Sequence, residues 1–346
     1  MRNLKHVYLI LSVFIILAIS CKKTIRNSSH ITSIEGKINP RLINNKTVYF
    51  HRNTDSLGLY FCEKTITDSC ELKPDGSFKF EFSNWDNSGF FDIGTKDNVF
   101  ARNYFLQPGD QLNLIFEGNE MPVALNLTGR VGEYNLFLQV FSDTFYRNAP
   151  VKEMYYKTSN YMLAPDYSVY INNRRDKELT FFQNYFKGKE VDSVFKFYFE
   201  NEIDYNWAND KLYFLWKKRI RKEVVPVDTS YFDFLKIIKV DNPKALICPS
   251  YVRFINLYIR ELLDEQMQTN TVFNSAIERF NLAKSHLNGM GLKIAYYNFL
   301  RDEINGVDAA EDRNKHESTI QKMLEICYQS TNDSAFYHYV KSINKN

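Results

Sequence analysis

The spacing of apolar residues changes near residue 130, and this change constrains the fold more than any other feature of the sequence. Before Gly129, short apolar segments alternate with polar residues, a period of two that is typical of strands. After Gly129, apolar residues recur every three or four positions, as in amphipathic helices. The sequence therefore predicts an α+β protein, with an N-terminal antiparallel β-sandwich or barrel domain over residues 31–130 and an all-helical domain over residues 131–346.

The expected strands are short, rich in β-branched or aromatic residues, and separated by turn formers. They cover residues 33–38, 47–50, 57–61, 77–82, 90–93, 99–106, 111–115 and 124–127. Asp75-Gly76 predicts a tight hairpin turn, because glycine readily takes the positive φ that such turns need. Pro108-Gly109-Asp110 predicts a second turn between two strands.

The helical part contains five apolar stripes at helical spacing, which we interpret as core-facing seams rather than ligand grooves. They are Leu179, Phe182 and Phe186; Ile255, Tyr258 or Ile259, and Leu262; Phe273, Ala276 or Ile277, Phe280 and Leu287; Ile320, Met323 or Leu324, and Cys327; and Phe336, Tyr339, Val340 and Ile343. Asp333 or Ser334 is placed to cap the helix that carries the last stripe.

A basic run, Lys217-Lys218-Arg219-Ile220-Arg221-Lys222, follows an acidic stretch that includes Glu200 and Glu202. Positive charge stabilises the C-terminal end of a helix, because the helix dipole is negative there. The run therefore predicts the end of one long helix. Contact with anionic lipid headgroups is the alternative.

The N-terminus has the pattern of a lipoprotein signal peptide. Arg2 and Lys5 precede a thirteen-residue apolar run, residues 7–19, and the segment Leu17-Ala18-Ile19-Ser20-Cys21 resembles a lipobox. An uncleaved membrane helix would need about 20 apolar residues, more than this run provides. We therefore expect residues 1–20 to be a signal peptide, Cys21 to carry the lipid, and residues 21–30 to form a tether.

The N-terminal segment also bears on the net charge of the mature chain and on its location in the cell. The sequence has 44 basic and 41 acidic residues, and removal of the signal peptide leaves a net charge near +1, which demands no nucleic acid partner. Lys22 and Lys23, rather than an acidic run, follow the lipidated cysteine. We therefore expect a cell-envelope protein, lipid-anchored at the periplasmic face of the outer membrane.

Four further cysteines, Cys62, Cys70, Cys248 and Cys327, include no C-x-x-C pair, so neither a dithiol redox motif nor a zinc ribbon is present. A hairpin centred on Ile66 would place Cys62 opposite Cys70, within reach of a disulfide that an oxidising periplasm permits. Two buried strand cysteines are the alternative. Cys248 and Cys327 lie in apolar contexts that favour core packing.

Other motifs of catalysis or ligand binding are incomplete. Gly289-Met290-Gly291 has no third glycine and no preceding strand, and His316-Glu317 has Ile320 where a zincin needs its second histidine. Glu200 and Asp204 are helical neighbours, a spacing commoner on solvated faces than in acid/base pairs. We therefore expect no catalytic residue, no cofactor and no metal site.

The order of features resembles the N-terminal half of lipid-anchored, thioredoxin-like thiol:disulfide oxidoreductases of the TlpA/ResA kind. The matching stretches are Ile34-Glu35-Gly36-Lys37-Ile38, Pro74-Asp75-Gly76-Ser77-Phe78-Lys79-Phe80, Leu106-Gln107-Pro108-Gly109-Asp110-Gln111-Leu112, Leu127-Thr128-Gly129, and Tyr231-Phe232-Asp233-Phe234-Leu235 followed by Pro249-Ser250-Tyr251. The resemblance implies the lipid anchor at Cys21 and a β-plus-helical region that spaces, docks or binds something for the redox domain. Those proteins continue into a Trp-Cys-x-x-Cys active site, which this sequence lacks, so no catalytic residue is carried over.

These observations favour a non-enzymatic, lipid-anchored periplasmic lipoprotein with a binding or docking role. Its partners would be the membrane, through the lipid, and a periplasmic protein, which the resemblance implies is thioredoxin-like. One alternative is an accessory or degenerate relative of thioredoxin-like thiol:disulfide redox machinery. A hydrolase without a recognisable motif is the other.

Overall fold

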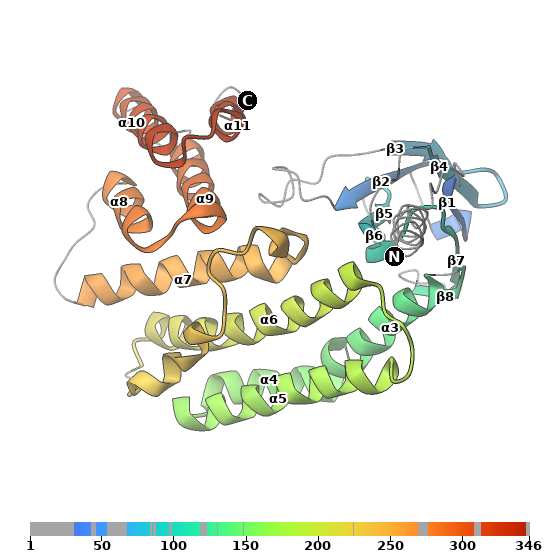
Figure 1. Cartoon of the computed structure of the whole chain (residues 1–346), viewed down its shortest axis with the longest axis horizontal. Helices are drawn as coiled ribbons and strands as arrows, with labels where there is room; N and C mark the ends of the chain where they lie inside the picture. Colours follow the sequence, from blue (N-terminus) through green and yellow to red (C-terminus); the bar gives the residue numbers. More distant parts are fainter. Residues whose placement is uncertain are drawn as a thin grey trace, which may run out of the picture.

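The computed structural model describes residues 31–42, 46–53, 68–83, 85, 88–96, 99–117, 123–129, 131–147, 149–223, 225–268, 276–307 and 313–343. Over these residues the chain is α+β, as predicted: two four-stranded sheets are followed by a helical region (Figure 1). The predicted strand at 57–61 and Phe273 lie outside the described residues. No helix in the described part is long and apolar enough to span a membrane.

The strands are β1 (Thr32–Ile38), β2 (Thr47–Asn53), β3 (Asp68–Glu71), β4 (Ser77–Phe82), β5 (Gly89–Gly94), β6 (Val99–Leu106), β7 (Gln111–Glu117) and β8 (Val123–Thr128). One sheet has the order β4-β1-β7-β8 and the other β3-β2-β5-β6. The sequence predicts antiparallel sheets, and this prediction is wrong for one pair of strands, because β1 and β7 pair in parallel. A parallel pair needs a long crossover, and strands of the other sheet lie in the connection between these two.

The two predicted turns are present, but neither closes a hairpin within one sheet. Gly76 has a φ of +82° and joins β3 to β4, and Gly109 has a φ of +77° and joins β6 to β7, so each turn carries the chain between sheets. A Cβ on Gly76 would lie 1.9 Å from the carbonyl oxygen of Ile38. The strand β4 pairs with β1 instead, where Phe78 faces Gly36 and its ring fills the space above that glycine.

The two sheets pack face to face through aromatic rings. The Phe50 ring of β2 lies 5.6 Å from the Phe80 ring and 4.6 Å from the Phe82 ring of β4, centroid to centroid. Phe78 and Phe80 are buried, as the predicted alternation requires, and Phe82 is half-buried. The N-terminal part is therefore a β-sandwich.

The helical elements are α3 (Gly132–Ser142), the π-helix η2 (Asp143–Arg147), α4 (Ala149–Tyr161), α5 (Ala164–Tyr185), α6 (Ser193–Ile220), α7 (Pro249–Gln268), α8 (Ala276–His286), α9 (Gly289–Val307), α10 (Arg313–Thr331) and α11 (Ser334–Ile343). Three short 3-10 helices are η1 (Pro40–Leu42), η3 (Thr229–Lys236) and η4 (Pro243–Ile247). The long helix α6 packs against α5 and α7, and α8 to α11 group above α7 in Figure 1, to the left of the strands.

The local helix predictions are confirmed. The described members of the five apolar stripes face the interior, and Ile320, Met323 and Cys327 are fully buried. The backbone N–H of Phe336 donates to Asp333 Oδ1 at 2.9 Å, which is the predicted cap of α11. The basic run coincides with the end of α6.

The sandwich and the helices share one core. The Phe105 ring of β6 lies 5.2 Å from Phe195 of α6, and Phe90 of β5 contacts Tyr198 at 3.9 Å between centroids. Asp192 caps α6 by accepting from the N–H groups of Val194 and Phe195, and it also accepts from Gln107 Nε2 in the β6–β7 turn. The change from strand to helix falls between Thr128 and Gly132. Independent folding of 31–130 and 131–346 stays a prediction.

Candidate functional site

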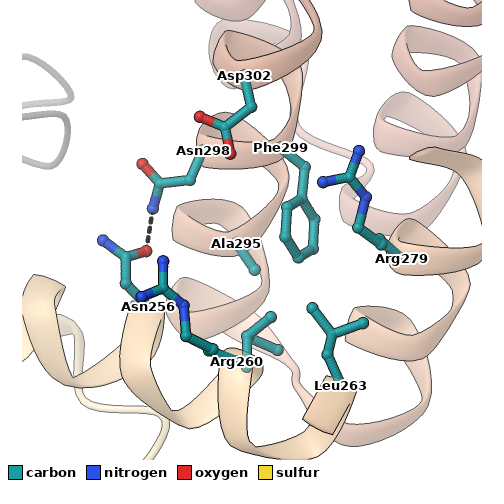
Figure 2. A pocket seen from close by; sticks show the side chains of 9 residues that line it. Asn256, Arg260, Leu263, Arg279, Ala295, Asn298, Phe299 and Asp302 are labelled. Atoms are coloured by element: carbon teal, nitrogen blue, oxygen red, sulfur yellow. Dashed lines mark hydrogen bonds between the residues drawn. The ribbon is translucent and has the colours of Figure 1, made fainter. Parts of the chain in front are cut away.

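A cavity of about 320 Å³ opens between α7, α8 and α9 (Figure 2). It is lined by Asn256, Ile259, Arg260 and Leu263 of α7, by Arg279 of α8, and by Ala295, Asn298, Phe299 and Asp302 of α9. On both α7 and α9 the lining positions follow the spacing i, i+3, i+4, i+7, which puts them on one face of each helix. The cavity is therefore the groove where these two helix faces meet.

The floor of the cavity is apolar and firmly packed. Ile259, Ala295 and Phe299 are buried. The Phe299 ring lies 6.2 Å from Phe280 of α8, whose ring in turn stacks on Tyr296 at 4.3 Å. Because these rings support one another across two helices, the floor offers a preformed surface for an aliphatic or aromatic group.

Two guanidinium groups flank this floor. Arg279 lies over the Phe299 ring at 5.6 Å, and its Nη2 is 3.9 Å from Glu303 Oε2. Arg260 lies over the Trp216 ring of α6 at 4.8 Å. Figure 2 shows Arg279 on one side of the ring of Phe299 and Arg260 on the other. Stacking on aromatic rings orients both guanidinium planes and leaves N–H groups for a ligand.

Polar side chains complete the walls. Asn298 Nδ2 donates to Asn256 Oδ1, a hydrogen bond that ties α9 to α7 (Figure 2). Asp302 supplies the single carboxylate among the described residues that line the cavity. Apart from Asp302, the same lining residues include none of the usual nucleophiles and proton carriers, since no serine, threonine, cysteine, lysine, histidine or tyrosine is among them. The groups present are suited to holding an anionic group over an apolar surface.

The residues predicted to carry the anchor and the disulfide are only partly described. Cys21 and Cys62 lie outside the described residues. Cys70 is half-buried on β3 and is bonded to no described cysteine, and burial raises the pKa of its thiol. The Cys62–Cys70 bridge and the lipid on Cys21 stay predictions.

The other two cysteines are core residues, as predicted. Cys248 and Cys327 are fully buried. The Cys248 Sγ donates to the carbonyl oxygen of Tyr198 at 3.5 Å, and burial raises its pKa well above the ordinary value. Burial raises the pKa of Cys327 to about 12. Because the thiolate is the reactive form, neither thiol is activated.

The incomplete motifs have structural roles. Gly289, with a φ of +49°, starts α9, and the next N–H, that of Met290, donates to Asp241 Oδ1 at 2.9 Å, so a carboxylate of the chain itself occupies this helix N-terminus. His316 Nδ1 lies 2.8 Å from Glu303 Oε1. No group of three or more potential metal ligands occurs in the described part of the chain.

The two carboxylates at helical spacing on α6 do not face one another as a catalytic pair. Glu200 Oε1 lies 3.9 Å from Lys196 Nζ, and Asp204 Oδ1 accepts from Arg175 Nε at 2.7 Å. Each carboxylate is therefore matched to its own cation.

A buried charge cluster joins η2, α5 and α6. Arg174 Nε donates to Glu178 Oε1 at 2.9 Å, its Nη1 lies 3.4 Å from Asp210 Oδ2, and its guanidinium lies 4.7 Å over the Tyr146 ring. The Tyr146 hydroxyl donates to Glu178 at 3.0 Å, and burial raises the pKa of this phenol well above its ordinary value. The cluster is internally compensated, which is the pattern of a structural network.

Lys211 of α6 is a second buried charge, and no carboxylate compensates it in any described ion pair. Its side chain is enclosed, and Nζ donates to Ser168 Oγ at 2.5 Å. The rings of Trp207, Tyr231 and Phe234 surround the amine at 5.0 to 5.8 Å. Burial lowers the pKa of Lys211 to about 8.

Comparison of the chain with protein-family models, with curated proteins and with solved structures finds no match. The resemblance to the oxidoreductases of the TlpA/ResA kind therefore rests on the short stretches of sequence alone and stays a prediction.

Proposed function

We propose that this protein is a lipid-anchored, non-catalytic lipoprotein that binds a small carboxylate-bearing molecule in the cavity between α7, α8 and α9. The observation that carries the proposal is the pair of stacked guanidinium groups, of Arg260 and Arg279, on either side of a buried apolar floor. A guanidinium presents parallel N–H donors that match the two oxygens of a carboxylate. The apolar floor accommodates the rest of the molecule.

The size and charge of the cavity support a small ligand. A volume of about 320 Å³ lies at the lower end of the roughly 300–1,000 Å³ typical of small-molecule sites. The two arginines and Asp302 leave a net positive charge in the lining, which favours an anion. We also propose that Cys21 carries a lipid that anchors the protein in the outer membrane, facing the periplasm. The pattern of the signal sequence supports this part of the proposal.

Calorimetric titration of the purified full chain in mild detergent with 3-phenylpropionate tests the binding role. This probe combines one carboxylate with an aromatic end. We expect saturable binding, and we expect Arg260→Gln and Arg279→Gln each to weaken it about tenfold or more, because a hydrogen bond to a charged group contributes about 1.5–3 kcal/mol. Arg301→Gln is the matched control, since Arg301 is exposed on α9 and does not line the cavity.

Two results would contradict the proposal. One is the absence of binding by the wild-type chain. The other is an equal loss of affinity in the cavity variants and in Arg301→Gln, because the same loss from a residue outside the cavity would show that only the net charge of the protein matters.

A further inference from the structure

The cavity contains charges of both signs that do not neutralise one another. Asp302 makes no hydrogen bond or ion pair with another described residue, and Arg279 forms its ion pair with Glu303, outside the cavity lining, at 3.9 Å. Arg260 likewise has no ion pair in the described part of the chain and rests on Trp216. A surface that keeps a cation and an anion separate around one cavity has room for a ligand between them.

The opposite charges lie at different borders of the apolar floor. On α9, Asp302 is the last lining position, two turns beyond Ala295. Figure 2 shows its carboxylate at the upper end of the cavity, with Arg260 and Leu263 at the lower end and Arg279 to the side of Phe299. The hydrogen bond between Asn256 and Asn298 holds the two helices that carry these charges. The helices that carry both charges are thus tied together, and the side chains of Arg260 and Asp302 are exposed at the rim of the cavity.

We propose that the ligand is a zwitterion, an α-amino acid with an apolar or aromatic side chain. This inference rests on the function proposed above. The carboxylate would bind the guanidinium groups of Arg260 and Arg279, the ammonium group would pair with Asp302, and the side chain would lie on Ile259 and Phe299. A simple carboxylate leaves Asp302 unpaired, and a phosphate ester places two negative charges beside it. An amino acid satisfies both signs at once and fits the small volume.

Four related probes separate the contributions of the two charges. They are L-phenylalanine, 3-phenylpropionate without the ammonium group, N-acetylphenylalanine with that group neutralised, and phenylalanine amide without the carboxylate. We expect L-phenylalanine to bind the full-length protein about tenfold more tightly than any of the other three.

The variant Asp302→Asn tests whether Asp302 binds the ammonium group. In this variant L-phenylalanine should lose its advantage, while 3-phenylpropionate should bind as well as it does to the wild type or better. Glu325→Gln is the matched control, since Glu325 is an exposed carboxylate on α10 outside the cavity, and it should keep the wild-type ranking.

The outcomes distinguish this inference from the function on which it rests. If 3-phenylpropionate and L-phenylalanine bind equally to the wild type, or if Asp302→Asn keeps the preference for L-phenylalanine, the zwitterion is wrong and the carboxylate site stands. If none of the four probes binds, the proposed function fails as well. Tight binding of phenylalanine amide with weak binding of the three probes that carry a carboxylate would overturn the roles of the two arginines.

Discussion

Replacement of Asn135 by leucine tests how the helices hold the sandwich. Asn135 of α3 is fully buried, and its Oδ1 accepts from the backbone N–H of Phe105 at 2.6 Å. Its Nδ2 donates to the carbonyl oxygen of Phe105 at 2.9 Å and to that of Val131 at 3.1 Å. Phe105 lies on β6, the edge strand of its sheet, so the amide of Asn135 takes the place of a neighbouring strand.

The size of the effect follows from this geometry. Leucine has nearly the shape of asparagine but cannot hydrogen-bond, so the N–H and the C=O of Phe105 would be left buried without partners. An unsatisfied buried polar group costs about 1–3 kcal/mol. For two such groups we expect the free energy of unfolding to fall by about 2–6 kcal/mol, a large part of the roughly 5–15 kcal/mol of a typical domain. Asn173→Leu, on the exposed face of α5, should change it by less than about 0.5 kcal/mol.

Urea unfolding followed by tryptophan fluorescence and by far-UV circular dichroism measures this loss. Trp85 lies beside Phe50 in the sandwich, while Trp207 and Trp216 lie on α6, so fluorescence reports on both parts of the chain. The midpoint should fall in Asn135→Leu at a nearly unchanged slope. A loss below about 1 kcal/mol would show that water or a shift of α3 satisfies the strand edge, and the reasoning would be refuted.

The remaining predictions concern a buried amine, the anchor and the thiols. Burial lowers the pKa of Lys211 from 10.5 to about 8. Burying the charged amine therefore lowers the free energy of unfolding of the wild type, and this loss is complete below pH 8 and absent above pH 10.5. Lys211→Met should therefore stabilise the protein at pH 7 by up to about 3 kcal/mol, less what the contacts between the amine and the surrounding rings contribute. A difference in the free energy of unfolding between the variant and the wild type that does not shrink between pH 8 and 10.5 would contradict this. Cys21→Ser should abolish incorporation of labelled palmitate, and equal labelling of both proteins would end the anchor hypothesis. The purified protein should not accelerate reduction of insulin by dithiothreitol, because its sequence has no C-x-x-C pair. Turnover that is lost in Cys62→Ser or Cys70→Ser would make that segment an active site.

Local structure was predictable where it depends on neighbouring residues. The alternation of Phe78 and Phe80 marks the buried face of β4, and the glycines at positions 76 and 109 mark the turns. Strand pairing was not predictable in the same way. A period of two tells which face of a strand is buried and says nothing about which strand lies beside it. The pairing of β1 with β4 depends on the fit of the Phe78 ring over Gly36, which joins residues distant in the sequence.

The cavity illustrates the same division. The apolar stripe through Ile255, Ile259 and Leu262 identifies α7 as an amphipathic helix with a buried face. Asn256 and Arg260 lie directly beside that stripe, where a sequence pattern describes them as ordinary surface residues. They become wall residues only because α9 and α8 bring Asn298 and Arg279 to the same groove. The crossing of helices is set by packing over the whole face, which no local pattern contains.

The shared core makes the position of the cavity a property of the whole chain. Aromatic contacts from β5 and β6 to Phe195 and Tyr198 fix α6 against the sandwich, and α7 packs along α6. The cavity helices therefore connect to the sandwich through packed elements rather than through a loose linker. Figure 1 shows α8 and α9 above α7 at the left and the strands at the right. The strand β1 follows the segment that would carry the lipid. If Cys21 carries the lipid, as proposed, the anchor precedes β1, and the packed contacts through α6 and α7 hold the cavity at a fixed position relative to the sandwich that follows the anchor.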